Sequence, residues 1–182
     1  MQKSLYLAGV GGQGLQVVGK TLVEAAYKAG YNVTFSPRYG FEKRGGLTSC
    51  YVVVSDGEIG NPRKKMQDIL LVMEPKAYNS FRNDVKPGGT LIVNSTLVSA
   101  QDAPPEGVKR VDVPIHDICV ELGNTKVIST VALGVIAALM TDMFPNKDDL
   151  LNFMLEKLNK ASLNEINTKA FYAGYEKAQS LL

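Results

Sequence analysis

The stretch Ser4–Gly30, SLYLAGVGGQGLQVVGKTLVEAAYKAG, decides the fold. Its apolar start is typical of a buried β-strand, and its end has the periodicity of an amphipathic helix. Between these two segments, Gly9, Gly11 and Gly14 fit the spacing G-x-G-x-x-G. A strand, a glycine turn and a helix in this order predict the opening unit of a Rossmann-like sheet.

The glycine turn predicts a place for an anion. Backbone N–H groups at a helix N-terminus carry partial positive charge and attract phosphate or carboxylate groups. Because glycine has no Cβ, it also lets a ligand or another backbone come close. The simpler alternative is a tight turn that only packs the helix against the sheet, and both interpretations stay open from the sequence.

A dinucleotide site needs a further group that this sequence lacks. Such sites usually place Asp or Glu at the end of the second strand, where the carboxylate holds the ribose hydroxyls. Here the expected second strand, Tyr31–Phe35, ends in Ser36-Pro37-Arg38, and the next acidic residue is Glu42. Arg38 has the charge to meet a 2′-phosphate, but the pattern disfavours NAD or FAD on this chain alone.

Length and composition bound the class of protein. The chain has 182 residues, of which 45% are hydrophobic and 21% charged, and this suits one soluble domain with its own core. A net charge of +2 provides no basic field for nucleic acid. The first strand begins almost at residue 1. We therefore expect no signal peptide. The longest apolar stretch, Val127–Phe144, is too short and too polar to predict a membrane span, and the two separated cysteines predict a reduced, cytoplasmic setting.

The residues that usually carry chemistry are few. Cys50 and Cys119 lie far apart, and without a CxxC motif they predict neither a disulfide framework nor an iron–sulfur or zinc site. Cys50 stands among apolar residues, so we expect it in the core rather than as a nucleophile. His116 is the single histidine and has no evident partner nearby in the sequence. We assign no catalytic residue and no metal ligand to this chain.

Strand-like and helical segments alternate along the chain and predict its architecture. We expect an α/β fold, namely a three-layer sandwich with a Rossmann-like, mostly parallel sheet, helices on both faces and a helical C-terminal part. Residues 1–182 then form a single domain. After Tyr31–Phe35, strands are expected at Leu47–Ser55, Asp68–Met73, Thr90–Asn94 and Val108–Pro114, and helices over 74–83, Ile115–Leu122, Val127–Phe144, 147–160 and Ser162–Leu182.

Three local features add detail to this scheme. Lys86-Pro87-Gly88-Gly89 is a turn signal. Ser162 and Glu165 have the spacing of a capping box that opens the last helix. The segment Val127–Phe144 is apolar on most sides, which predicts either a central core helix or a helix buried at a subunit interface.

The segment Ser36–Gly46 is expected as a polar loop beside the glycine turn. It carries Arg38, Lys43 and Arg44. Because the carboxyl ends of parallel strands meet at one edge of a sheet, both segments should lie together and form an anion site, where arginine binds phosphate bidentately. Two alternatives remain: a solvated loop with internally paired charges, and a protein contact anchored by Arg and Tyr.

The order of these segments resembles one known family over nearly the whole chain. The chain is similar to the gamma subunits of 2-oxoacid:ferredoxin oxidoreductases, nearer the 2-oxoglutarate or generic 2-oxoacid branch than the pyruvate branch. Where the family often has Asn at the start of the long apolar helix, this chain has Ser129. The segments that carry the resemblance are Gly11-Gly12-Gln13-Gly14, Arg44-Gly45-Gly46, Ser55-Asp56 before Ile59 and Pro62, the ELGN segment 121–124, and Asn167 followed by Gly174.

The resemblance implies a subunit of an enzyme complex. Such complexes oxidatively decarboxylate a 2-oxoacid to an acyl-coenzyme A and pass the electrons to ferredoxin. Thiamine diphosphate, Mg and iron–sulfur clusters are implied on alpha, beta and ferredoxin-like partner subunits. This chain is implied to have a structural role and to help place coenzyme A. The residues assigned to that role are Gly11, Gly12, Gln13, Gly14, Arg38, Lys43 and Arg44.

Two other functions compete with this interpretation. A self-sufficient Rossmann dehydrogenase predicts that the purified chain binds NAD(P)H, which the missing acid disfavours. A stand-alone nucleotide- or acyl-coenzyme A-binding protein predicts ligand binding without partner subunits. If the helix Val127–Phe144 faces a partner, the isolated chain should expose apolar surface and associate as a homodimer.

Overall fold

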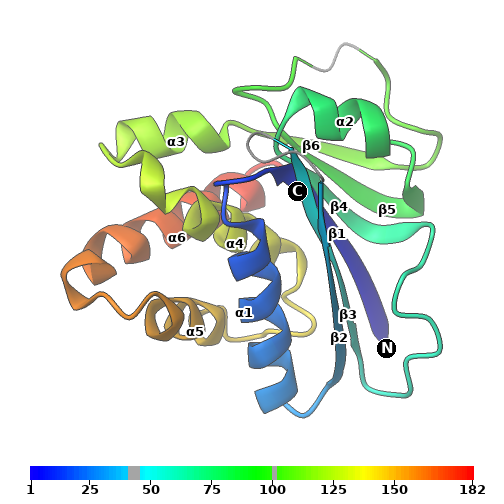
Figure 1. Cartoon of the computed structure of the whole chain (residues 1–182), viewed down its shortest axis with the longest axis horizontal. Helices are drawn as coiled ribbons and strands as arrows, with labels where there is room; N and C mark the ends of the chain where they lie inside the picture. Colours follow the sequence, from blue (N-terminus) through cyan, green and yellow to red (C-terminus); the bar gives the residue numbers. More distant parts are fainter. Residues whose placement is uncertain (41–45, 100–101) are drawn as a thin grey trace.

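A six-stranded mixed sheet forms the centre of the computed structural model, which describes residues 1–40, 46–99 and 102–182. Helices cover both faces of this sheet (Figure 1). The strands are β1 (Gln2–Val10), β2 (Asn32–Tyr39), β3 (Leu47–Ser55), β4 (Gln67–Val72), β5 (Val85–Asn94) and β6 (Lys109–Val113). The helices are α1 (Leu15–Lys28), α2 (Pro75–Phe81), α3 (Ile115–Glu121), α4 (Ile128–Leu139), α5 (Asp148–Leu158) and α6 (Asn164–Gln179), with 3₁₀ turns at Thr125–Val127 and Ala161–Leu163.

The strand order is β2-β3-β1-β4-β5-β6, and five of the six strands point the same way. β1, β4, β5 and β6 pair in parallel, whereas β3 is antiparallel to both β1 and β2. The direction of β3 follows from connection length. A parallel neighbour needs a crossover of about a dozen residues, and residues 40–46 are too few. The predicted α/β class with a mostly parallel sheet is confirmed, with β3 as the exception.

The two faces of the sheet bury separate cores. Alternate side chains of β1 point to opposite faces, so Leu5 and Leu7 join the large core under α1, α3, α4, α5 and α6. Tyr6 and Ala8 join a smaller core on the face that α2 covers. Figure 1 shows α2 on one side of the sheet and the C-terminal helices on the other. This is the predicted three-layer arrangement, with unequal outer layers.

Helix α4 is the centre of the large core. Every residue from Ile128 to Ala138 is buried within the chain itself. The helix ends at Leu139, so the prediction of one helix over Val127–Phe144 was too long. Of its two predicted positions, the central core position is confirmed. Its apolar surface is therefore covered by this chain and does not argue for a partner subunit.

Helices α4 and α6 meet backbone to backbone. A Cβ on Gly134 would lie 2.0 Å from the carbonyl oxygen of Phe171, and a Cβ on Gly174 would lie 2.2 Å from that of Val131. Beside this crossing, Thr130 donates a hydrogen bond of 2.6 Å to Asn167 Oδ1. Only hydrogen fits at the two glycines, so they fix how closely the helices approach.

Two predicted boundaries were wrong for local reasons. Ser36–Tyr39 was expected in a loop but continues β2, because an edge strand tolerates Pro37 without losing a ladder hydrogen bond. Ser162 does not cap the last helix, which begins at Asn164 without a side-chain cap.

The Lys86–Gly89 turn lies inside the bounds of β5. Strand pairing jumps there from Val85 to Thr90, so the four residues bulge out of the ladder as a turn would. Gly88 has φ +79 within this bulge. In the described part of the chain, no helix combines the length and apolar character needed to cross a membrane.

We predict that Gly174→Ala lowers the free energy of unfolding by about 2–3 kcal/mol. The added methyl group has no room against the Val131 carbonyl, and this cost exceeds the gain of about 1 kcal/mol in helix propensity. Urea unfolding followed by circular dichroism measures the change.

Gly60→Ala is the matched control for this substitution. None of the described residues lies within 4 Å of a Cβ built on Gly60, so we expect a change within about 0.5 kcal/mol. Equal stability of the two variants would contradict the close packing of α4 and α6.

Candidate functional site at the carboxyl edge

The candidate site lies at the carboxyl edge, which we define as the border of the sheet where β1, β2, β4, β5 and β6 end and β3 begins. The Gly11 N–H donates a hydrogen bond of 3.2 Å to the Gly46 carbonyl. The glycine turn and the end of the segment Ser36–Gly46 therefore touch, which confirms the prediction that they share one edge. Ligands of open α/β sheets bind at this kind of border.

The glycine turn has a packed half and an open half. Gly14, in the left-handed region with φ +72, is packed, and a Cβ there would lie 2.8 Å from Ser129 Cβ at the start of α4. Gly11 and Gly12 have no heavy atom of the described residues within 4 Å of a built Cβ. The two interpretations of the turn thus apply to different residues. Gly14 packs α1 against α4, and Gly11 with Gly12 offers backbone that a partner can reach.

Gln13 braces the turn from inside. Its side chain is 6% exposed. Its Oε1 accepts a hydrogen bond of 3.0 Å from the Val10 N–H, and its Nε2 donates one of 2.6 Å to Glu74 Oε1. The amide thus ties the end of β1 to the start of α2. A Cβ on Gly9 would lie 2.2 Å from Gln13 Oε1, so this brace explains the first glycine of the motif.

Arg38 reaches the carboxyl edge on the face opposite α1. It pairs with Ser49 across β2 and β3. The Tyr51 hydroxyl, and after it Tyr6, favour the charged guanidinium and raise the pKa of Arg38 above its ordinary value. Since Tyr6 belongs to the core under α2, the sheet separates Arg38 from the first turn of α1. Arg38 and the glycine turn share the edge but do not lie side by side.

A tyrosine pair supports the position of Arg38. The rings of Tyr6 and Tyr51 stack with their centroids 4.1 Å apart. Tyr6 also donates a hydrogen bond of 2.9 Å to Ser49 Oγ, and burial raises the pKa of Tyr6 to about 12. Its hydroxyl therefore stays protonated near neutral pH. The other two predicted cationic residues, Lys43 and Arg44, lie outside the described residues.

Sequence reasoning missed a second brace at this edge. Asn94, fully buried at the end of β5, donates from Nδ2 to the Met73 carbonyl at 3.1 Å. The same Nδ2 lies 2.9 Å from His116 Nδ1, and Asn94 Oδ1 accepts from the Ile115 N–H at 3.1 Å. The single histidine thus has a partner 22 residues away in the sequence. The sequence did contain a signal for this role of Asn94, because a polar asparagine stands at the end of an otherwise apolar strand.

The sheet order gives a physical reason against a dinucleotide site. In a Rossmann unit the second strand lies next to the first, so its terminal acid reaches the ribose. Here β3 lies between β1 and β2. The end of β2 is displaced by one strand, and it carries Arg38 and Tyr39 instead of an acid.

The cysteines have no thiolate chemistry near neutral pH. Burial raises the pKa of Cys50 to about 12 and that of Cys119 to about 11. The prediction that Cys50 belongs to the core is confirmed, because it is fully buried. Across the ranges that the structure describes, no three His, Cys, Asp or Glu side chains gather as metal ligands.

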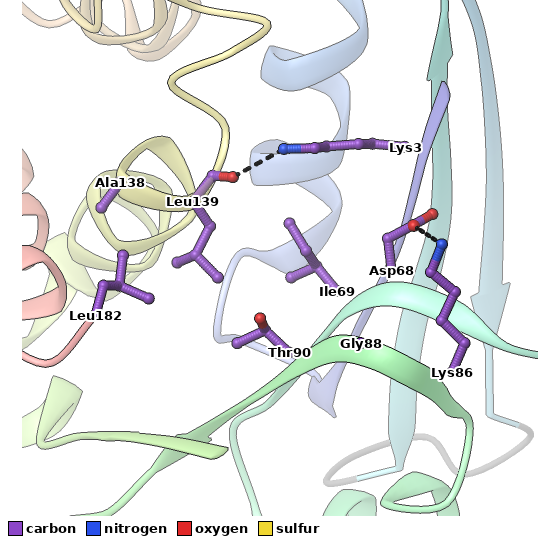
Figure 2. Close-up of a pocket in the computed structure, with 9 residues that line it drawn as sticks. All are labelled: Lys3, Asp68, Ile69, Lys86, Gly88, Thr90, Ala138, Leu139 and Leu182. Atoms are coloured by element: carbon purple, nitrogen blue, oxygen red, sulfur yellow. Dashed lines mark hydrogen bonds and ion pairs between the residues drawn. The ribbon is translucent and has the colours of Figure 1, made fainter. Parts of the chain in front are cut away.

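A pocket of about 360 Å³ lies at the opposite, amino edge of the sheet (Figure 2). Two lysines line this pocket, and both have acidic partners. Lys3 Nζ is 2.5 Å from Asp142 Oδ1 and donates to the Leu139 carbonyl at 3.2 Å. Lys86 Nζ is 2.5 Å from Asp68 Oδ1. These charges hold β1, β4 and β5 to the end of α4, so we assign the pocket a structural role.

Asp68 is the centre of this cluster. Burial of its carboxyl group favours the neutral form, but hydrogen bonds from Lys86 and from the Ser4 hydroxyl and N–H outweigh burial and lower the pKa of Asp68. A carboxylate with a lowered folded-state pKa stabilises the fold above its unfolded pKa. That contribution is lost as the pH falls through the folded value.

We predict that Asp68→Asn lowers the free energy of unfolding at pH 7 by about 1 kcal/mol, because it removes a charge-assisted hydrogen bond. The difference from the unaltered chain should shrink as the pH falls below about 4, where the carboxyl group becomes protonated. Urea unfolding at pH 7 and pH 3 measures both values. Glu156→Gln, an exposed control of equal charge change, should have little effect at either pH. A cost of Asp68→Asn that is the same at both pH values would contradict this assignment.

Sequence comparison places the chain among oxidoreductase subunits. Residues 4–177 match the family described as pyruvate ferredoxin/flavodoxin oxidoreductase. The 2-oxoglutarate synthase subunit KorC of Methanocaldococcus jannaschii is 31% identical over 184 residues, covering 100% of this chain and 96% of KorC. The ketoisovalerate oxidoreductase subunit VorA of Methanothermobacter marburgensis is 32% identical over 178 residues, covering 97% of this chain and 36% of VorA. The chain thus spans about a third of the VorA length.

Solved structures share the fold. The gamma subunit of a keto/oxoacid ferredoxin oxidoreductase from Geobacter sulfurreducens PCA matches with a TM-score of 0.85 and 31% identity, over 100% of this chain and 98% of that chain. A 2-oxoglutarate:ferredoxin oxidoreductase from Magnetococcus marinus, solved with 2-oxoglutarate, coenzyme A and succinyl-CoA bound, matches with a TM-score of 0.88. That match has 22% identity, covers 100% of this chain and 32% of the other, and supports the fold alone.

Fold and site together define a Rossmann-like α/β domain whose carboxyl edge has backbone at Gly11 and Gly12 that the described residues leave uncovered. The chain belongs to the pyruvate ferredoxin/flavodoxin oxidoreductase family. The predicted resemblance to the gamma subunits of 2-oxoacid:ferredoxin oxidoreductases is confirmed.

Proposed function

We propose that this chain is the gamma component of a multisubunit 2-oxoacid:ferredoxin oxidoreductase. The complex would oxidatively decarboxylate a 2-oxoacid to an acyl-coenzyme A, with ferredoxin as electron acceptor. The whole-length match to KorC and the match to the Geobacter gamma subunit support this assignment. Thiamine diphosphate, Mg and the iron–sulfur clusters would be held by the alpha, beta and ferredoxin-like partner subunits. The isolated chain would then have no turnover of its own.

The observation that carries the docking role is the division within the glycine turn. Gly14 is held against Ser129, and Gln13 is held by Glu74, so the turn is fixed from behind. No described residue lies within 4 Å of a Cβ built on Gly11 or Gly12. Backbone that is both fixed and accessible can receive another surface without first becoming ordered, which avoids part of the entropic cost of association. We infer that a partner subunit docks on this turn.

The phosphates of coenzyme A would meet cationic residues at the same edge. Arg38 is exposed, and its contact with Tyr51 favours the charged guanidinium. Arginine binds phosphate bidentately, and Lys43 and Arg44 add charge in the adjoining sequence. The fold neighbour from Magnetococcus marinus was solved with coenzyme A bound. We propose that Arg38, Lys43 and Arg44 help to hold coenzyme A, whose thiol would accept the acyl group.

Gly11→Gln tests the docking role. A side chain at Gly11 meets none of the described residues within 4 Å of its Cβ and leaves the hydrogen bond from its N–H to Gly46 possible, so the fold should persist while docking is blocked. We predict that the affinity-tagged variant recovers about tenfold less of the thiamine diphosphate-binding subunit from native extract than the unaltered chain does.

Gly57→Gln is the matched control, because Gly57 is equally open but lies beyond the amino edge, where β3 ends. The Gly57→Gln variant should assemble normally. Normal assembly of Gly11→Gln would contradict the docking role.

Replacing Arg38, Lys43 and Arg44 with glutamine tests the coenzyme A role. In complexes that do assemble, this triple substitution should raise the KM for coenzyme A and leave the KM for the 2-oxoacid unchanged. Nucleotide or acyl-coenzyme A binding by the tagged chain without partners would favour the stand-alone binding protein.

A further inference from the structure

A second pocket, of about 530 Å³, lies among the C-terminal helices on the α1 side of the sheet. The first turn of α1, the start of α4, the end of α5 and the start of α6 surround it. Its apolar wall is formed by Val17, Val127, Leu158 and Leu163. Small-molecule sites typically have volumes of about 300–1,000 Å³ and mostly apolar linings with a few polar groups. The volume and the lining of this pocket fall within that range.

The charges that line this pocket are all positive. Lys126, Lys157 and Lys160 line it, and none of its ten lining residues is acidic. Lys157 is paired with Glu24 at 2.6 Å. Neither Lys126 nor Lys160 forms an ion pair with any residue that the structure describes. The pocket thus has, beside an apolar wall, two lysines that form no ion pair with the residues the structure describes.

The backbone that carries these lysines is well fixed. Asn124 Oδ1 accepts a hydrogen bond of 3.0 Å from the Lys126 N–H, which orders the 3₁₀ turn before α4. On the opposite side, Asn167 Nδ2 donates to the Leu163 carbonyl at 2.9 Å. The pocket is therefore present in the chain before any ligand arrives.

The contrast with the amino-edge pocket decides the kind of ligand. There Lys3 and Lys86 are neutralised by Asp142 and Asp68, so an added anion gains little. At Lys126 and Lys160 an anion would meet cations without acidic partners, and the apolar wall would exclude water from the rest of the ligand. A ligand with an apolar body and one anionic end can contact both the apolar wall and the two lysines.

We propose that this pocket binds an organic anion with an apolar chain, whose carboxylate or phosphate group faces Lys126 and Lys160. The site is separate from the open glycines of the carboxyl edge, although Ser129, which lines it, also contacts Gly14. The proposal does not rest on the function proposed above. It requires neither a partner subunit nor coenzyme A, and it gives the chain a ligand site of its own.

Isothermal titration calorimetry on the full chain tests this proposal, with decanoate, decyl phosphate, acetate and decyltrimethylammonium as probes. At least one of the two long-chain anions should bind. Acetate should not bind, because it lacks the apolar chain, and the cationic probe should bind at least about tenfold more weakly. A preference between decanoate and decyl phosphate identifies the anionic group of the natural ligand.

The double variant Lys126→Gln/Lys160→Gln should lower the affinity for the bound anion by about fivefold to tenfold. Both lysines are exposed, so the fold should persist. The matched control, Lys20→Gln/Lys177→Gln, removes two exposed lysines elsewhere and should bind as the unaltered chain does. Equal binding by the cationic probe, equal losses in the two double variants, or no binding of either long-chain anion would overturn the proposal.

Discussion

The backbone contact between α4 and α6 is the constraint on which the rest of the structure depends. Gly134 and Gly174 let the two helices approach until their carbonyl groups fill the space of a side chain. This approach buries α4 on all sides and places its N-terminus, with Ser129, at the carboxyl edge. Ser129 in turn lies against Gly14, the residue that precedes α1. The glycine turn thus packs through Gly14 on the helix that crosses α6 in the large core.

At the carboxyl edge, buried side chains hold the backbone in place from the inner side. The side chains of Gln13 and Asn94 connect neighbouring strand ends to the starts of α2 and α3. These amides point inward, so they position the edge instead of reacting there. What remains open is glycine backbone, together with Arg38 on its own face of the sheet. This arrangement is the one that the proposed positioning role requires.

Much of the fold could be predicted from local sequence. The glycine turn and the bounds of β3 at Leu47–Ser55 were predicted, since each depends on residues close together in the chain. The direction of β3 was not predicted, because the length of the connection from β2 decides it. The face of the sheet on which Arg38 lies was not predicted either, because β2 continues for two residues beyond Pro37. The pairs Gln13–Glu74 and Asn94–His116 join residues 61 and 22 positions apart, and no local pattern marks such partners.

Hydrogen exchange of the chain, alone and within its native complex, tests the central claim most directly. The claim is that the open glycine turn is the surface on which a partner subunit docks. It predicts that peptides spanning Gly11–Gly14 gain protection in the complex, because their amides become covered, while the Lys86–Gly89 bulge at the amino edge exchanges as before. Protection of the bulge with no change at the turn would contradict the account.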